Sequence, residues 1–268
     1  MSLRLFSRFA RERMAGRKLF VPFVTAGDRG LAFTRRAVLT LVEAGADAIE
    51  LGVPFSDPLA DGPVIQRASQ RALQRGTTLP AIFDLVRDLR QVTDIPLLLM
   101  GYLNPFLHPT LEKNALRAAQ SGVDGFIVPD LPPEEAVAWN KACARTGLDT
   151  VFLVAPTSTP QRIQSVVKAS TGFIYYVSVT GTTGMRNQLP LADLAAGIGQ
   201  VRQATPLPIL VGFGISTPAQ AKNISGLADG VIVASVLIHA METAASDAQA
   251  LQRLAGLSRR LAKAVKNR

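Results

Sequence analysis

Glu50 and Asp61 are the side chains of this sequence best suited to acid–base chemistry. They stand eleven positions apart, Glu50 within the apolar run 48–53 and Asp61 in the segment rich in Pro and Gly that follows. An enclosed carboxyl group costs free energy unless a partner or a reaction compensates it. Two carboxyls in unlike surroundings can take different proton-transfer roles. The pair predicts a catalytic site, although a buried hydrogen-bonding glutamate and an Asp-Gly-Pro turn would give the same pattern without catalysis.

The elements that must position this pair alternate in type along the chain. Continuous apolar runs, typical of parallel strands covered on both faces, occur at 19–24, 48–53, 96–100, 125–128, 150–154, 173–178, 208–212 and 230–234. Amphipathic stretches of helical length lie between or after them, at 32–44, 79–92, 111–121, 133–146, 160–169, 192–203, 218–225 and 251–265. Thr159 and Thr217, each followed by proline, predict helix starts, and Gly45 and Gly122 predict helix ends.

Eight strands that alternate with eight helices, preceded by an N-terminal helix, predict a single closed (β/α)₈ TIM barrel, an α/β fold. The length of 268 residues suits one such barrel, and no linker divides the chain, so we expect one domain over residues 1–268. An open doubly wound sheet is the main alternative. It is disfavoured because the first strand continues into Thr-Ala-Gly-Asp at 25–28 rather than into a glycine-rich nucleotide fingerprint.

The basic charge of the chain is concentrated at its two ends. Of a formal net charge of +9, residues 1–18 carry +5 and residues 253–268 carry +6, so the residues between them sum to −2. Terminal helices with a solvated basic face explain this distribution better than a nucleic-acid site does. No apolar run reaches the roughly 18 residues that a membrane helix needs, and Cys143, the only cysteine, allows no internal disulfide. We therefore expect a cytoplasmic protein that binds neither nucleic acid nor membrane.

In such a barrel the active site lies at the C-terminal ends of the strands. The segments Gly-Phe-Gly-Ile-Ser at 212–216 and Ala-Ser at 234–235 follow the last two strands, the usual place for a phosphate. Neither contains Lys or Arg, so backbone N–H groups, Ser235 and Gly184 would bind the anion. Tight turns would explain these glycines equally well. The long polar segment 179–188 suits a lid over the substrate, or else a surface loop without a role.

Apolar and aromatic residues at or near the strand ends predict a pocket for a flat hydrophobic substrate. They are Phe23, Leu99, Tyr102, Ile127, Phe152, Tyr175 and Phe213. Each of them could instead belong to the top layer of the core. We expect His108 and His239 at the surface, and no His, Cys or carboxylate cluster has the spacing of a metal site.

The run Glu-Leu-Gly-Val-Pro-Phe-Ser-Asp-Pro-Leu-Ala-Asp-Gly-Pro-Val-Ile-Gln at 50–66 closely resembles the signature of the tryptophan synthase alpha subunit family. Further matching segments occur in order at 21–28, 100–105, 130–132, 175–184 and 212–216. The resemblance covers essentially the whole chain. It is specific, because other phosphate-binding barrels share only the later glycines.

The resemblance implies cleavage of indole-3-glycerol phosphate to indole and glyceraldehyde 3-phosphate, a retro-aldol reaction of a carbon–carbon lyase without metal or Schiff base. Glu50 matches the general acid–base of the family, and Asp61 matches the carboxylate that accepts the indole N–H and stabilises the indolenine. The phosphate would lie at Gly184, Gly214, Ala234 and Ser235. The indole would lie against Phe23, Tyr102, Ile127, Tyr175 and Phe213, and lid closure would involve Thr183.

The resemblance also implies a partner, a beta subunit that converts the indole to L-tryptophan with pyridoxal phosphate in an α₂β₂ tetramer. The contact residues of the family correspond to Asp57, Pro58, Asn104, Pro105, Asp130 and Pro132. This chain lacks a lysine set in the pattern of a pyridoxal phosphate site, so the cofactor is expected in the partner and none in this chain.

Two positions depart from the family pattern. Ala234 stands where the family usually has glycine, which places a methyl group beside the phosphate, and Val179 stands where some members have arginine. Other hypotheses are a free-standing indole-3-glycerol phosphate lyase that releases indole and a non-catalytic barrel that activates a partner. A sugar-phosphate isomerase would leave the aromatic pocket without a purpose.

Overall fold

Eight parallel strands close into one barrel in the computed structural model, which describes residues 2–178, 190–212 and 214–266. Each strand pairs with the next along the chain, and the first pairs with the last. The strands are β1 (Leu19–Thr25), β2 (Ile49–Gly52), β3 (Leu97–Met100), β4 (Gly125–Ile127), β5 (Asp149–Val154), β6 (Ile174–Val177), β7 (Ile209–Gly212) and β8 (Gly230–Val233). The predicted (β/α)₈ barrel is confirmed, and its extent as one domain over 1–268 stays a prediction.

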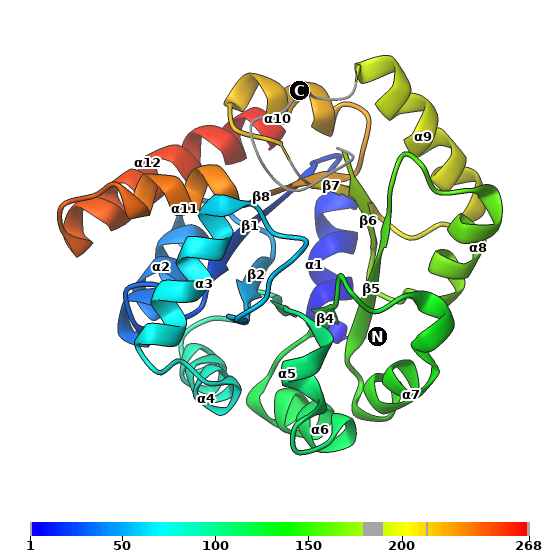
Figure 1. The fold of residues 1–268 in the computed structure, drawn as a ribbon. Helices are drawn as coiled ribbons and strands as arrows, with labels where there is room; N and C mark the ends of the chain where they lie inside the picture. Colours follow the sequence, from blue (N-terminus) through cyan, green and yellow to red (C-terminus); the bar gives the residue numbers. More distant parts are fainter. Residues whose placement is uncertain (1, 179–189, 213, 267–268) are drawn as a thin grey trace.

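Most helices surround the barrel on the outside, and α1 lies across one end of it (Figure 1). They are α1 (Leu3–Met14), α2 (Leu31–Glu43), α3 (Pro63–Gln74), α4 (Leu79–Leu89), α5 (Leu103–Leu107), α6 (Leu111–Ser121), η1 (Pro133–Glu135), α7 (Val137–Thr146), α8 (Pro160–Ala169), α9 (Leu191–Ala204), α10 (Pro218–Ser225), α11 (Ser235–Glu242) and α12 (Asp247–Lys266). The expected helix at 133–146 is divided into η1 and α7. Helices α3, α5 and α11 lie outside the ranges expected for helices.

The predicted helix boundaries have the expected local chemistry. The Thr159 hydroxyl accepts from the Arg162 N–H, and Thr217 forms a complete capping box with Gln220. Gly122 ends α6 in the left-handed conformation with φ 90°, where a side chain would be strained. These signals hold the loops between helix and strand short, so each helix packs back on the barrel.

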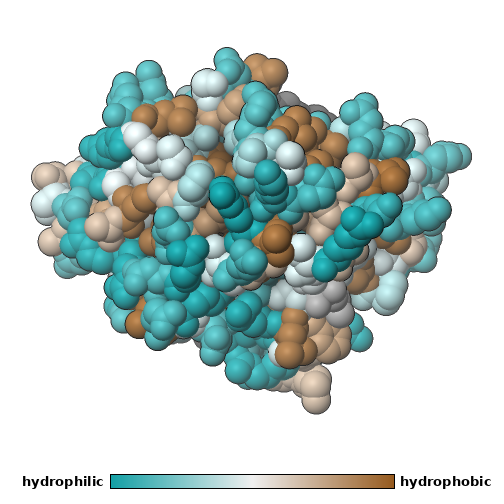
Figure 2. All heavy atoms as spheres, turned by 90° about the horizontal axis from the view of Figure 1, so that it is seen from below, coloured by the Kyte–Doolittle hydropathy of each residue, from teal (hydrophilic) through white to brown (hydrophobic). Residues whose placement is uncertain are grey.

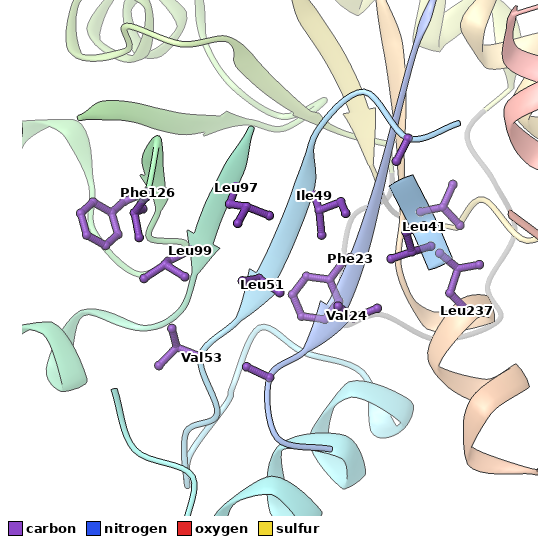
Figure 3. Close-up of a cluster of buried hydrophobic side chains, with 14 of the residues drawn as sticks. Phe23, Val24, Leu41, Ile49, Leu51, Val53, Leu97, Leu99, Phe126 and Leu237 are labelled. Atoms are coloured by element: carbon purple, nitrogen blue, oxygen red, sulfur yellow. The ribbon is translucent and has the colours of Figure 1, made fainter. Parts of the chain in front are cut away.

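The barrel has an inner and an outer core because strand side chains alternate between two faces. Figure 3 shows the outer core, in which Ile49 and Leu51 of β2 pack beside Leu97 and Leu99 of β3. The inner core contains the alternate residues, including Ala48, Leu98 and Phe173. Glu50 lies between two outward-facing residues, so its side chain points into the barrel.

Helix α1 covers the N-terminal end of the barrel, where it meets aspartates that precede the strands. Arg4 pairs with the buried Asp124 at 3.0 Å and Arg8 with the buried Asp47 at 3.2 Å. Lys266 of α12 reaches Asp47 at 2.8 Å. Part of the basic charge at both termini is therefore used to neutralise buried carboxylates. The sequence analysis expected the basic side chains of the terminal helices to be solvated, and for these three it was incomplete.

The side of the barrel drawn in Figure 2 is dominated by hydrophilic residues, with hydrophobic residues scattered among them in small groups. Among the described residues, no helix is long and apolar enough to cross a membrane.

Candidate active site

Glu50 is the most enclosed ionisable group at the mouth of the barrel. Its residue is 0% exposed, and it pairs in register with Phe23 of β1 and Leu98 of β3. Neither carboxyl oxygen has a hydrogen-bond partner among the described residues. Burial raises the pKa of Glu50 well above its ordinary value. Burial therefore favours the protonated form of Glu50, which can act as an acid.

Asp61 lies on the loop between β2 and α3 and is half-buried. Its N–H donates to the Pro58 carbonyl at 3.0 Å, and its own carbonyl accepts from Gln66 Nε2 at 2.8 Å. Burial raises the pKa of Asp61 to about 6, against the lowering effect of a hydrogen bond with Tyr102. Asp61 is therefore mainly ionised at neutral pH, whereas burial favours the protonated form of Glu50, so the two carboxyls are suited to different roles.

Two tyrosines connect these carboxyls. The Tyr102 hydroxyl accepts from the Ala60 N–H at 2.8 Å and bonds Asp61, so it holds the Asp61 loop from the β3 side. Tyr175 of β6 is buried, and its pKa is raised well above its ordinary value by burial, then by the charges of Glu50 and Asp61. Tyr175 thus lies within electrostatic reach of both groups, which form one site.

A small cavity of about 20 Å³ lies between the Asp61 loop and β3. It is lined by Phe23, Thr25, Gly52, Val53, Asp61, Ile65, Ser69, Met100, Gly101, Tyr102 and Pro129. Gly52 makes room for the aromatic wall, because a Cβ at that position would lie 2.3 Å from the Phe23 ring. The sequence analysis missed Gly52, although it lies two residues after Glu50 and so shares its inward face.

The residues predicted for the aromatic pocket lie in different parts of the barrel. Phe23 and Tyr102 line the cavity, and Ile127 and Tyr175 belong to the inner core. Leu99 and Phe152 do not line this cavity and pack in the outer core, and a core position was the alternative expected for them. Each stands one position away from inward-facing neighbours on its strand, and strand alternation turns it toward the helices. Phe213 lies outside the described residues.

The predicted phosphate position coincides with the start of the eight-residue helix α11. Ala234 is the N-cap and Ser235 the first helical residue, and helical hydrogen bonding begins with the Leu237 N–H, which donates to the Ala234 carbonyl at 2.9 Å. The N–H groups of Ser235 and Val236 precede that bond and are suited to an anion. Gly214, after β7, has φ 75°.

Several predicted residues fall in the segment that the structure does not describe. They are Thr183, Gly184, Val179 and the proposed lid at 179–188. Within the described ranges, no three His, Cys, Asp or Glu residues lie together as a metal site would require.

The predicted partner residues lie on the loops after β2 and β4 and on the short helix α5. Asp57, Asn104 and Asp130 are exposed, while Pro58, Pro105 and Pro132 are half-buried. The Asp130 carboxylate accepts from the Leu103 N–H at 2.9 Å, which ties the loop after β4 to α5. Leu59, between the proposed contact residues and Asp61, is 83% exposed. A partner that covered this rim would contact the loop that carries Asp61.

Comparisons with known proteins agree on one family. Residues 9–266 match the family model of the tryptophan synthase alpha chain. The chain is 53% identical to the tryptophan synthase alpha chain of Citrifermentans bemidjiense over 253 residues, 94% of each chain. It is 50% identical to that of Geobacter sulfurreducens over 240 residues, 89% of this chain and 90% of the relative. The crystal structure of tryptophan synthase subunit alpha from Legionella pneumophila superposes with a TM-score of 0.91 at 36% identity, over 99% of this chain and 98% of that one.

Proposed function

The chain belongs to the tryptophan synthase alpha chain family, and we propose that Glu50 and Asp61 are the acid–base pair of its reaction. The activity is the carbon–carbon lyase activity of the alpha subunit in tryptophan biosynthesis, cleavage of indole-3-glycerol phosphate to indole and glyceraldehyde 3-phosphate. The observation that supports these roles best is a fully buried Glu50, with no hydrogen-bond partner among the described residues, beside an Asp61 whose pKa is raised to about 6.

Glu50 acts twice in this mechanism. Its protonated carboxyl donates to C3 of the indole ring, which gives the cationic indolenine. The resulting carboxylate then removes the proton from the glycerol hydroxyl adjacent to the ring. As that C–O becomes a carbonyl, the carbon–carbon bond breaks, and its electron pair returns to the ring to release indole. Glu50 ends protonated as it began, so no metal or Schiff base is required.

Asp61 stabilises the intermediate. A carboxylate that accepts the indole N–H attracts the positive charge that develops on the indolenine nitrogen, and the attraction is stronger in a site of low dielectric. The Tyr102 hydroxyl and the Gln66 side chain hold the Asp61 loop for this role. Phe23 and Tyr102 provide flat walls for the ring.

The phosphate of the substrate binds at the start of α11. Its charge is stabilised there by the N–H groups of Ser235 and Val236, the Ser235 hydroxyl and the helix dipole. The methyl group of Ala234 leaves the backbone donors in place. Gly184 and Gly214 are the further proposed contacts.

We propose that the exposed rim with Asp57, Pro58, Asn104, Pro105, Asp130 and Pro132 binds a beta subunit in an α₂β₂ assembly. Pyridoxal phosphate then belongs to that subunit, and this chain supplies indole without a cofactor of its own. A partner seated on the rim would order the Asp61 loop, which explains why catalysis would depend on it.

The decisive experiment measures indole release from indole-3-glycerol phosphate by the purified chain, alone and with a beta subunit. We expect slow release alone and a strong acceleration in the mixture. Fast release that beta does not change would favour a free-standing lyase. No release in either condition would contradict the proposed activity and favour a non-catalytic barrel.

A further inference from the structure

Four charged side chains, Arg67, Glu242, Arg71 and Asp28, form a chain of ion pairs beside the mouth of the barrel. Arg71 of α3 binds Asp28 with two bonds, of 2.7 and 3.0 Å, and Glu242 of α11 with a third of 2.7 Å. Arg67, one turn earlier on α3, binds both oxygens of Glu242 at 2.8 Å. The carboxylate side chains of Asp28 and Glu242 are only 10% and 17% exposed.

The network is strong because its contacts are bidentate and partly enclosed. The hydrogen bonds from Arg67 and Arg71 lower the pKa of Glu242 to about 2, and the bond to Asp28 raises the pKa of Arg71. The two arginines and Glu242 therefore favour their charged forms in this network. Since each charge already has a partner, the network is suited to fixing helices rather than to binding a ligand.

Helix α3 connects the network to Asp61. The helix begins at Pro63, two residues after Asp61, and Gln66 in its first turn binds the Asp61 carbonyl. Ile65 and Ser69 of α3 line the mouth cavity, while Arg67 and Arg71 face the network. A small rotation or shift of α3 would therefore move both the Asp61 loop and one wall of the cavity.

Helix α11 connects the network to the proposed phosphate position. Ser235 begins this helix and Glu242 ends it, and α11 packs beside α3 (Figure 1). The loop that carries Asp28 also holds the far end of α11, because Arg29 donates to the carbonyls of Met241 and Ala244 at 3.0 and 2.7 Å.

We propose that Arg71 is a positioning residue for the lyase reaction. It fixes α3 against Asp28 and Glu242, and thereby sets the position of Asp61 relative to a substrate whose phosphate is bound at α11. This inference rests on the proposed roles of Asp61 and of the α11 start. Neither Arg71 nor Asp28 touches the substrate; they act through α3.

The test replaces Arg71 with Met and with Lys, and Asp28 with Asn, and measures kcat and KM for indole release. Displacement of a catalytic group by about 1 Å can cost on the order of 10²-fold in rate. We expect kcat to fall roughly 10- to 100-fold in Arg71→Met, and less in Arg71→Lys, whose single ammonium group cannot replace the guanidinium fork. KM should change by less than about threefold, because the phosphate contacts remain.

A double-mutant cycle with Asp61→Asn separates positioning from general support of the fold. If Arg71 acts through Asp61, Arg71→Met should lower the residual activity of Asp61→Asn by no more than about twofold. Equal losses in both backgrounds would overturn the inference, as would unchanged kcat in Arg71→Met. If Arg71→Met does not fold, the same cycle is run with Asp28→Asn and judged in the same way.

Arg87→Met is the matched control, because Arg87 forms an exposed ion pair with Asp84 on α4, far along the chain from Asp61. It should leave kcat unchanged. The cycle requires that the parent cleave indole-3-glycerol phosphate and that Asp61→Asn be impaired. If either condition fails, the proposed function is contradicted. If both hold and the Arg71 variants have the kcat of the parent, only the positioning role is contradicted.

Discussion

The two ends of the barrel treat buried carboxyl groups in opposite ways. At the N-terminal end, Asp124 is fully buried and accepts hydrogen bonds from Arg4, Arg90, the Ser2 hydroxyl and the Leu97 N–H, at 2.6 to 3.0 Å. At the mouth, Glu50 is equally buried and has no hydrogen-bond partner among the described residues. A buried carboxyl group thus accepts several hydrogen bonds at the N-terminal end and none from the described residues at the mouth.

Asp149 shows an intermediate case at the N-terminal end. It accepts from the Ser2 N–H at 2.9 Å and from the Thr171 hydroxyl at 2.7 Å. Burial still raises the pKa of Asp149, against the lowering effect of these donors. Glu50 lacks such donors among the described residues, so its burial favours the protonated form. The difference separates carboxyls that stabilise the fold from one that is available for proton transfer.

The largest effect is expected from Glu50→Gln, which removes the transferable proton and keeps the shape. Indole formation should fall roughly 10²- to 10⁴-fold, the usual contribution of general acid–base catalysis, while substrate binding survives. Steady-state rates of indole release and equilibrium binding of indole-3-glycerol phosphate measure the two quantities. Near-normal turnover in Glu50→Gln would refute the mechanism, and Glu112→Gln at the exposed start of α6 is the control.

Glu50→Gln should also be more stable than the parent at neutral pH. Because the folded pKa of Glu50 is raised, the folded protein retains a proton that the unfolded chain loses above about pH 4.5. The unfolded state then binds fewer protons, so the stability of the parent falls as pH rises from that value. Urea unfolding at several pH values measures the difference in unfolding free energy between Glu50→Gln and the parent. This difference should shrink as pH falls toward 4.5. An advantage independent of pH would argue against a raised pKa.

The opposite result is expected at the other end for Asp124→Asn. Loss of the charge leaves Arg90, whose side chain is 9% exposed, without its buried partner. Breaking a buried ion pair in this way should cost about 3 kcal/mol of unfolding free energy. Urea unfolding measures the loss of stability. At a low temperature, where Asp124→Asn is still folded, its rate of indole release should equal that of the parent.

Asp88→Asn provides the comparison for Asp124→Asn, because its pair with Arg35 is exposed. Such a pair contributes about 0 to 1 kcal/mol. An equal loss of stability in both variants would mean that burial is not what distinguishes Asp124. A loss of turnover in folded Asp124→Asn would mean that the two ends are not functionally separate.

The sequence was a sufficient guide to the barrel and to Glu50 for a physical reason. Continuous apolar runs determine which strands are buried, and a single glutamate in such a run must face one of two cores. Alternation along the strand also determines which of the two cores a side chain enters. Leu99 and Phe152 alternate with inner-core residues, so this rule places both in the outer core. The ion-pair partners of Asp124 could not be predicted, because they come from segments up to 120 positions away.

Helix α3 was missed because its signals are weak in isolation. It carries arginines and glutamines on much of its surface, and Gly62 at its N-cap offers no side-chain hydrogen bond. The helix is stabilised by tertiary contacts, namely the burial of Ile65 and Ala68 and the ion pairs of Arg71. Tertiary stabilisation of this kind is invisible to local propensity.

A smaller effect, on the pH dependence, tests the state of Asp61 at the mouth. Since its pKa is raised to about 6, kcat/KM should rise as pH increases through 6 and the carboxylate forms. At higher pH it should fall again as Glu50 loses its proton. A phosphate monoester also titrates near pH 6, so the assignment requires that the acidic limb change in Asp61→Asn. An identical acidic limb in that variant would assign it to the substrate.

The smallest effect is expected from Tyr102→Phe, which removes one hydroxyl from the mouth. The hydrogen bond from Tyr102 lowers the pKa of Asp61, so its loss should raise that pKa above about 6. The acidic limb of kcat/KM should move to higher pH, while the rate at pH 8, where Asp61 is ionised in both proteins, should fall only a fewfold. Tyr176→Phe is the matched control, because Tyr176 belongs to the outer core. If both variants shift the limb equally, the change reflects general loosening of the barrel. If neither variant shifts the limb, burial alone determines the pKa of Asp61. The mouth then differs from the N-terminal end because no hydrogen-bond donor changes the pKa of its carboxyl groups.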